Sequence, residues 1–382
     1  MQLTDATDAL SLTRQMIDIP SVSGEEGPLA DAVEAALRGA GFGSVDTLEI
    51  LRDGDAVCAR THLGLPQRVV LAGHLDTVPI AENVPGRLEV RDGVEVVWGR
   101  GSVDMLGGCA AALALACEAG AVIRGGAREA LTADVTWIFY DHEEVASHLN
   151  GLGRIQRLYP QWLAGDLALL GEPTAAHVEG GCNGTLRVIA HFPGRAAHSA
   201  RAWMGVNAIH AMAPVIERIA AYGNPVVTVD GLEFRESLSV VRVEGGIANN
   251  VIPEAASMTV NYRFAPSKRA DDALEWVRGL FEGTGATIEV DDLCEGARPG
   301  ADSPVAERFL SVARRVADEA GVQLALSAKV GWTDVARFTQ VGVPAMNFGP
   351  GDPLLAHTRD EHAPVSDIVR VHETLRAFLL AQ

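Results

Sequence analysis

The stretch that decides the fold is VTWIFYDHEE, residues 135–144. Its first six residues are apolar or β-prone without alternation, which predicts a strand that is covered on both faces. Similar runs occupy residues 69–72 (VVLA) and 167–170 (LALL), and the Ala- and Leu-rich residues 105–119 predict a buried helix. Strands that alternate with helices in this way predict an α/β layered domain.

Each of these three strands is followed by side chains that can bind metals. The endings are Gly73-His74-Leu75-Asp76, Asp141-His142-Glu143-Glu144 and Gly171-Glu172-Pro173. Because ligands of open α/β sheets bind beyond the carboxyl ends of the strands, we expect these side chains at one edge of the sheet. One such ending would be an ordinary turn, since Asp is a common turn residue. Three endings with the same chemistry indicate a site.

The candidate metal ligands are imidazoles and carboxylates without a thiolate, which suits Zn²⁺, Co²⁺ or Mn²⁺. They come from five separate segments and comprise His74, Asp76, Asp104, Glu143, Glu144, Glu172 and His357. Asp104 follows a glycine-dense turn, where a simple helix cap is the alternative role. Neighbouring strand residues point to opposite sides, so one of Glu143 and Glu144 could bind metal while the other faces a water. The alternative for that pair is an exposed acidic turn.

The pattern of predicted strands and helices changes between residues 178 and 292. We expect a strand at 185–192, a helix at 206–222, strands at 238–244 and 257–264, a helix at 271–281 and a strand at 286–290. The order β-α-β-β-α-β is the ferredoxin-like arrangement, which we interpret as an inserted domain. The predicted organisation is therefore a catalytic domain formed by residues 1–177 and 293–382, interrupted by an inserted domain at 178–292.

Composition limits the class of protein. The 382 residues are 48% hydrophobic, 5% aromatic and 21% charged, which describes a globular protein of two or three domains. A net charge of -19 disfavours nucleic acid and anionic membranes as partners. The five cysteines form no C-x-x-C pair, so no thiolate zinc site is indicated. Residues 1–12 lack the features of a secretory signal, and we expect a cytoplasmic protein.

The motifs together resemble the di-zinc metallohydrolases that include aminoacylase, glutamate carboxypeptidase, acetylornithine deacetylase and succinyl-diaminopimelate desuccinylase. The resemblance covers essentially the whole chain and rests on GHLDTVP (73–79), GRGSVD (99–104), DHEE (141–144), GEP (171–173), GRAAHSA (194–200) and the late His357. The desuccinylase branch is the most similar, through NNVIP (249–253), NYRF (261–264) and GWTD (331–334).

The resemblance implies a zinc-hydrolase domain with a mixed central sheet flanked by helices, and two zinc ions in each chain, with Co²⁺ or Mn²⁺ as substitutes. It makes His74 and Glu172 ligands of one zinc, Glu144 and His357 ligands of the other, and Asp104 the bridge between them. Asp76 would hold the His74 ring in its tautomer. A cis peptide bond is expected after Asp104.

The implied chemistry is amide hydrolysis. Glu143 would act as the general base that takes a proton from the attacking water and passes it to the departing amine. His198, from the inserted domain of a partner subunit, would stabilise the oxyanion. Asn250, Arg263 and Thr333 would contact the carboxylates of the substrate. The resemblance therefore also implies a homodimer formed through the inserted domain.

The expected reaction is hydrolysis of N-succinyl-LL-2,6-diaminopimelate, a small N-acyl amino acid, in the synthesis of lysine and cell-wall precursors. The loop GCNG, residues 181–184, lacks an arginine that the resemblance leads us to expect, and Leu106 replaces a common lysine. An acetylornithine deacetylase-like amidohydrolase or a metallo-dipeptidase therefore remains an alternative. A binding protein without activity is disfavoured, because every ligand position and Glu143 are filled.

Overall fold

The structure is a computed structural model that describes residues 2–380, and the chain divides into two compact units. The first unit comprises Met1–Gly180, Gly300–Ser327 and Arg337–Gln382. The second comprises Gly181–Pro299 and Ala328–Ala336. The chain thus returns once more to the second unit over residues that the sequence analysis assigns to the catalytic domain.

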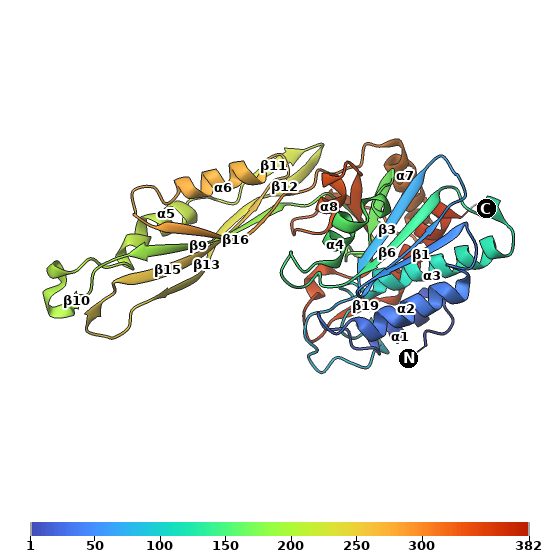
Figure 1. Cartoon of the computed structure of the whole chain (residues 1–382), viewed down its shortest axis with the longest axis horizontal. Helices are drawn as coiled ribbons and strands as arrows, with labels where there is room; N and C mark the ends of the chain where they lie inside the picture. The colour runs from blue at the N-terminus through green and yellow to red at the C-terminus, as the bar shows by residue number, and fades with distance from the viewer. Residues whose placement is uncertain (1, 381–382) are drawn as a thin grey trace. The chain divides into compact units, whose positions relative to one another are not determined.

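The first unit is built on an eight-stranded mixed sheet with the order β1-β2-β6-β3-β7-β18-β8-β17. Figure 1 labels β1, β3 and β6 of this sheet. Neighbours among β6, β3, β7 and β18 run parallel, whereas β1 and β2 pair antiparallel, as do β2 and β6 and also β18 and β8. The strands are β1 Leu48–Asp53, β2 Ala56–Thr61, β3 Arg68–His74, β6 Asp134–Tyr140, β7 Leu167–Leu170, β8 Val178–Gly180, β17 Leu326–Ala328 and β18 Ala345–Asn347. The three predicted apolar strands are confirmed as β3, β6 and β7.

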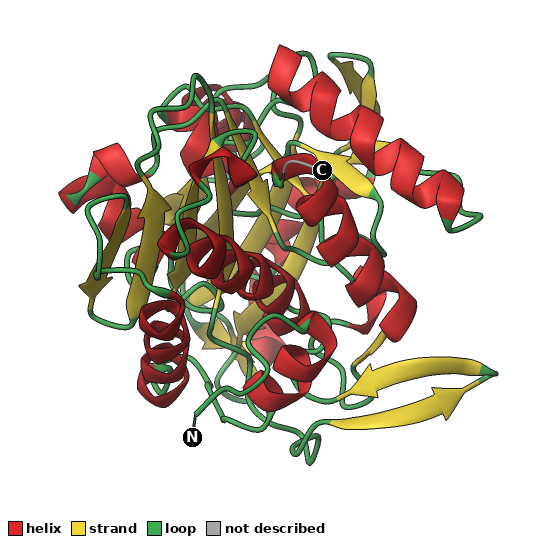
Figure 2. Ribbon diagram, turned by 90° about the vertical axis from the view of Figure 1, so that its right-hand side faces the viewer, coloured by secondary structure: helices red, strands yellow, loops and turns green. Residues whose placement is uncertain are grey.

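Helices cover this sheet because its central strands are apolar on both faces. One core joins the sheet to α1 Ala9–Ile17, α2 Gly27–Ala40, α3 Leu106–Arg124, α7 Pro304–Glu319 and α9 Val365–Leu379. α4 Gly151–Leu158 packs against β6, and α8 covers Val335–Gln340. Figure 2 shows several helices lying in front of the strands of this sheet. The predicted α/β class with a mixed sheet is confirmed.

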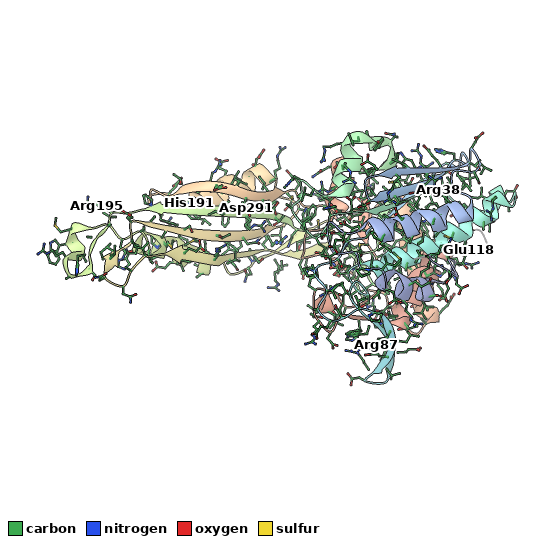
Figure 3. All side chains as sticks on the ribbon, turned by 60° about the horizontal axis from the view of Figure 1, so that its bottom comes forward. Arg38, Arg87, Glu118, His191, Arg195 and Asp291 are labelled. Carbon is green, nitrogen blue, oxygen red and sulfur yellow. The ribbon has the colours of Figure 1, made fainter. Side chains whose placement is uncertain are left out.

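The central helix of this unit is α3, which begins two residues after Asp104. It extends to Arg124, beyond the predicted end at residue 119, since buried Ile123 continues its apolar side. Among the described residues it is the one helix long and apolar enough to cross a membrane. Because 83% of that apolar window is buried inside the structure, we interpret α3 as a core helix. Figure 3 labels Arg38 and Glu118 on the neighbouring helices α2 and α3.

A smaller sheet of the first unit brings two distant loops together. Its order is β19-β5-β4, with β4 Arg87–Arg91, β5 Val94–Trp98 and β19 His362–Pro364. Trp98 pairs with His362, so the start of the loop that follows β5 lies beside the end of the loop that precedes β19. These two loops carry Asp104 and His357.

The second unit contains a four-stranded antiparallel sheet with the order β13-β15-β9-β16. Its elements are β9 Gly184–Pro193, β10 Ala197–His198, α5 Ala213–Ala220, β11 Val226–Val229, β12 Leu232–Arg235, β13 Ser237–Gly245, β14 Val251–Ile252, β15 Ala255–Phe264, α6 Ala270–Gly279 and β16 Thr287–Cys294. The main strands and helices follow the predicted β-α-β-β-α-β order. α5 begins later than predicted, because Val206 forms a bridge with Arg195 and Asn207 caps the turn that follows.

Candidate metal centre

His74 is the last residue of β3, and its ring is buried against the next loop. The Nδ1–H group donates a hydrogen bond of 2.9 Å to the backbone oxygen of Asp76, which directs Nε2 towards Asp104 Oδ1 at 3.2 Å. The residue before His74 has to be glycine, since a Cβ atom on Gly73 would lie 2.6 Å from the Sγ atom of Cys109. A ring held through Nδ1 has the tautomer that presents Nε2 to a metal.

Asp76 is fully buried, and it holds the His74 ring through its backbone oxygen and not through its carboxylate. Its Oδ1 atom lies 3.6 Å from the His74 Nδ1 atom, beyond hydrogen-bond distance. Instead the two oxygens accept hydrogen bonds from the backbone N–H groups of Glu143 (2.9 Å) and Glu144 (3.0 Å), and Ser23 Oγ donates a third (2.7 Å). Asp76 therefore fixes the backbone of both glutamates, a role that no sequence pattern indicated.

Asp104 lies between two histidines. Its Oδ1 atom is 3.2 Å from His74 Nε2, and its Oδ2 atom is 3.2 Å from His357 Nε2. The residue that caps α3 is Met105, without a side-chain hydrogen bond, so Asp104 is not the helix cap that the sequence left as its alternative role. The Asp104–Met105 peptide bond is cis, as the resemblance implies.

Three overlapping groups of side chains could each hold a metal ion. Within each group the ligand atoms lie within 4.8 Å of one another; the groups are His74–Asp104–Glu172, Asp104–Glu144–His357 and His74–Glu143–Glu144. His357 Nε2–H also donates to Glu144 Oε1 at 2.9 Å. The structure thus brings together all five predicted metal ligands, with Glu143 and Asp76 beside them.

The donor atoms and their spacing fit divalent cations. A tetrahedral zinc site with bonds of about 2.0–2.1 Å keeps its ligand atoms about 3.3 Å apart. The closest nitrogen-to-oxygen distances here, between 2.9 and 3.2 Å, approach that value. Imidazole and carboxylate ligands without thiolate also suit zinc, cobalt or manganese. Each of the first two groups could therefore hold one cation, with Asp104 common to both.

Negative charge is in excess at this edge of the sheet. Five carboxylates face two imidazoles: Asp76, Asp104, Glu143, Glu144 and Glu172 with His74 and His357. Burial lowers the pKa of His74, but the carboxylates of Asp104 and Asp76 outweigh it, and the pKa is raised well above its ordinary value. Unbalanced carboxylates in a partly buried site are costly unless cations neutralise them.

The pKa values of His357 and Asp104 are shifted in opposite directions. Hydrogen bonds to Asp104 and Glu144 raise the pKa of His357 to about 10. Burial raises the pKa of Asp104, but hydrogen bonds from His357 and His74 outweigh it and hold the pKa of that carboxyl well below its usual range. Without a cation, protons on the imidazoles therefore bridge the carboxylates. An entering cation has to displace these protons, so its affinity rises with pH.

The other four predicted site residues belong to the second unit, where they occupy two places. His198 and Asn250 are exposed neighbours, because Ser199 N–H donates to the backbone oxygen of Asn250 at 2.8 Å. They follow the end of β9 and precede the start of β15. Figure 3 shows Arg195 at this end, with His191 and Asp291 further along the sheet.

Arg263 and Thr333 lie at the opposite end of the same sheet. Arg263 of β15 pairs with Thr185 at the start of β9, whereas Ala255 pairs with Pro193 at the end of β9. The eight residue steps between Ala255 and Arg263 correspond to about 25 Å of strand. Thr333 is buried, and its backbone oxygen accepts from the Sγ atom of Cys182, just before β9.

The sequence analysis also missed a network that holds the loop before Glu143. Asp141 is buried and pairs with Arg154 at 2.7 Å. Glu26, from the start of α2, accepts from the His142 N–H group at 3.2 Å and lies 3.3 Å from the His142 ring. The contacts of Glu26 join residues 116 positions apart, so no local pattern could have indicated them.

Fold and site together define a metal-dependent amidohydrolase. The model of peptidase family M20/M25/M40 matches residues 70–381. The chain belongs to this family, as its resemblance to the di-zinc metallohydrolases predicted.

Two relatives match over nearly their full length. A Mycobacterium tuberculosis protein named "Putative succinyl-diaminopimelate desuccinylase DapE" is 48% identical over 372 residues, covering 97% of this chain and 98% of that protein. The succinyl-diaminopimelate desuccinylase of Corynebacterium glutamicum is 45% identical over 381 residues, covering 97% of this chain and 96% of its own length.

Solved structures share the fold at low identity. A tripeptidase from Staphylococcus aureus superposes with a TM-score of 0.77 at 18% identity, covering 98% of both chains. The YXEP protein of Bacillus subtilis, described as a dinuclear metal-binding peptidase of family M20, gives a TM-score of 0.65 at 17% identity, covering 97% of this chain and 96% of that chain.

Proposed function

We propose that this chain hydrolyses N-succinyl-LL-2,6-diaminopimelate to succinate and LL-2,6-diaminopimelate. Two relatives whose names carry this activity are 48% and 45% identical to the chain over nearly its whole length. The reaction belongs to the synthesis of lysine and of cell-wall precursors, which takes place in the cytoplasm.

The observation that carries the proposal is the position of Asp104, whose two oxygens each lie 3.2 Å from a different imidazole. We assign His74 and Glu172 to one zinc ion, Glu144 and His357 to a second, and Asp104 to both. When bound, two such cations polarise an amide carbonyl and lower the pKa of a water. Co²⁺ or Mn²⁺ would be substitutes, since the ligands are nitrogen and oxygen atoms.

Glu143 is our general base. It belongs to the group His74–Glu143–Glu144, and its backbone N–H is fixed by Asp76. Its carboxylate takes one proton from the attacking water while the new C–O bond forms at the amide carbon. The C–N bond then breaks, and Glu143 delivers that proton to the departing nitrogen, which leaves succinate and a free amine. His198 donates to the developing oxyanion.

We further propose that two copies of the chain complete the site. His198 and Asn250 lie about 25 Å along β15 from Arg263, a span that one small N-acyl amino acid does not bridge. If all of these residues contact one substrate, some must come from a second copy. A symmetric dimer meets that requirement by exchanging the same surface in both directions.

Exposed apolar side chains near His198 support this dimer. Trp203 and Met204 end the short helix Ser199–Met204 that follows His198 and are 77% and 60% exposed, and Ile247, between β13 and β14, is 83% exposed. Large apolar side chains that gather at one place on a surface mark interaction sites. We therefore assign the dimer contact to the inserted domain, residues 178–292.

Side-by-side turnover tests the substrate assignment. The zinc-loaded protein is given succinyl-diaminopimelate, acetylornithine and a dipeptide at equal concentrations, with the Glu143→Gln variant as the control for contaminating activity. We expect kcat/KM for the succinyl substrate to exceed the others by at least about 100-fold. A preference for acetylornithine would make the chain a deacetylase, and a preference for the dipeptide would make it a dipeptidase; either result overturns the assignment.

A further inference from the structure

One buried ion pair beside the metal centre has no part in the chemistry described above. The side chains of Arg100 and Glu361 are 4% and 1% exposed, and Arg100 Nη1 donates to Glu361 Oε2 at 2.7 Å. The two residues are 261 positions apart and lie in the loops that carry Asp104 and His357. The Gly99 N–H group also donates to the backbone oxygen of Glu361 at 3.0 Å, which joins the same two loops.

The remaining hydrogen bonds of Glu361 hold the Asp104 loop. Its Oε1 atom accepts from the N–H groups of Val103 at 3.0 Å and Asp104 at 3.1 Å. A carboxylate that accepts two backbone N–H groups fixes the peptide between them. Because Asp104 carries the oxygens that face both histidines, the position of Glu361 sets the position of those oxygens.

The remaining hydrogen bonds of Arg100 hold two other loops of the site. Its Nη1 group donates to the backbone oxygen of Thr358 at 3.3 Å, next to His357. Its Nη2 group donates to the backbone oxygen of Pro79 at 3.1 Å, in the loop that follows Asp76. One guanidinium therefore links three segments that carry site residues, through the planar geometry that arginine offers and lysine lacks.

A contribution to stability alone does not account for this pair. Removing two charges from water costs about as much as their attraction returns, so a buried ion pair is weak support for a fold. The residues that it holds are also those with the least other support. His74 and Glu172 end or follow strands of the central sheet, whereas Asp104 and His357 lie in loops outside the strands.

We propose that Arg100 and Glu361 are positioning residues that hold Asp104 and His357 at ligand distance from each other. The group Asp104–Glu144–His357 then depends on the pair more than the group His74–Asp104–Glu172, because His357 belongs to the first group alone. Neither Arg100 nor Glu361 is a proposed ligand of the metal or a proposed contact of the substrate. The inference rests on the proposed function, since it requires that these groups bind cations.

Zinc titration of the full chain tests the inference without measuring turnover. Metal is removed with a chelator, and Zn²⁺ is then added in competition with a coloured chelator, which gives a dissociation constant for each site. The variants are Glu361→Gln, which keeps an oxygen for the N–H groups but removes the charge, and Arg100→Lys, which keeps the charge but not the fork. His357→Ala identifies the constant that belongs to the group Asp104–Glu144–His357.

Asp134 provides a matched control at the opposite end of β6. It is buried and accepts backbone N–H groups from Leu63 at 2.9 Å, Gly64 at 3.1 Å and Leu65 at 3.0 Å. Asp134→Asn therefore disturbs another buried carboxylate that anchors a loop. It should lower the melting temperature and leave both zinc constants unchanged.

We expect Glu361→Gln and Arg100→Lys to weaken the site identified by His357→Ala about 10- to 100-fold, and the other site much less. Equal weakening of both sites, or constants that match those of Asp134→Asn, would overturn the inference while leaving the proposed function intact. Wild-type protein that binds no zinc would instead overturn the proposed function. If Glu361→Gln does not fold, Arg100→Lys decides the question by the same criterion.

Discussion

Each unit of this molecule buries carboxylates, but the two units compensate the charge of these carboxylates in different ways. In the second unit Glu236, with a side chain 4% exposed, accepts hydrogen bonds from the Ala265 N–H group at 2.7 Å and the Tyr262 hydroxyl at 3.1 Å. Tyr222 and Lys268 donate to the same carboxylate. Four donors around one carboxylate are what a buried charge needs in a finished fold.

The metal centre of the first unit has the opposite composition, with five carboxylates around two imidazoles. Burial raises the pKa of Glu236, but its donors outweigh burial and the pKa is lowered. At the metal centre the imidazoles compensate the negative charge of the carboxylates, and the pKa of His357 rises to about 10. The comparison teaches that a carboxylate whose charge is met by donors of its own chain is structural, whereas a cluster whose carboxylates outnumber its imidazoles indicates a place for a cation.

Metal removal should give the largest difference between the metal centre and the surroundings of Glu236. Treatment with a chelator is expected to abolish turnover, because the proposed mechanism assigns polarisation of the carbonyl to the bound cations, and added Zn²⁺ or Co²⁺ should restore it. Free zinc at 1,000 times its dissociation constant should stabilise the fold by about 4 kcal/mol. Full activity after dialysis against chelator, with metal absent by elemental analysis, would contradict the role of the cluster.

Replacing the proposed base should give the next largest effect. Glu143→Ala is expected to lower kcat by about 100- to 10,000-fold, since a positioned general base contributes that much. Bound zinc should stay at the wild-type level, because Glu143 is not among the proposed ligands. Glu289→Ala, an exposed glutamate at 67% side-chain exposure, is the control that should keep wild-type activity. Wild-type kcat in Glu143→Ala would remove Glu143 from the role of base.

Glu236 should affect stability without affecting the metal. Glu236→Gln is expected to lower the free energy of unfolding by about 2–3 kcal/mol, because it leaves buried donors of Tyr262 and Lys268 with a poorer acceptor. The control Glu244→Gln, in an exposed pair with Arg242, should change it by at most about 0.5 kcal/mol. Urea unfolding followed by circular dichroism measures both. A loss of zinc affinity in Glu236→Gln would contradict the division into structural and functional carboxylates.

The smallest expected effect is a pair of opposite pH slopes in the metal-free protein. The pKa of His357 is raised from 6.5 to about 10 in the folded state, so its contribution is complete below pH 6.5 and is lost as pH rises towards 10. The pKa of Glu236 is lowered from 4.5, so its contribution is complete above that pH and is lost as pH falls.

Melting temperatures across the pH range can test both slopes. Saturating zinc should remove the alkaline slope, because a metal ligand is already deprotonated, and should leave the acidic slope in place. His357→Gln should reduce the alkaline slope to the part that the raised pKa of His74 contributes, and Glu236→Gln should reduce the acidic slope. An alkaline slope that is unchanged in His357→Gln would assign it to a group other than His357.

Much of the fold could be predicted because the decisive pattern is local. Apolar runs long enough for one strand predicted β3, β6 and β7, and the order of strands and helices between residues 178 and 292 predicted the ferredoxin-like arrangement. The predicted start of α5 at residue 206 was wrong, since Val206 pairs with Arg195. Helical periodicity gives no information about such a contact. The return of Ala328–Ala336 to the second unit was missed for the same reason.

The candidate site could be predicted from residue types at the ends of strands, together with the resemblance to a known family. Its supporting contacts could not, because they join residues that are distant in sequence. Asp76 was predicted to hold the His74 ring, yet its carboxylate binds the backbone of Glu143 and Glu144. Pairs such as Arg100 with Glu361 appear only once the loops have their positions in space.

The central claim is that two cations share Asp104, and anomalous X-ray scattering at the zinc edge tests it most directly. Crystals of the zinc-loaded protein should show two peaks about 3.5–4 Å apart. Each should lie about 2.0–2.2 Å from a different oxygen of Asp104, one peak beside His74 and the other beside His357. A single peak, or two peaks that do not both contact Asp104, would contradict the account.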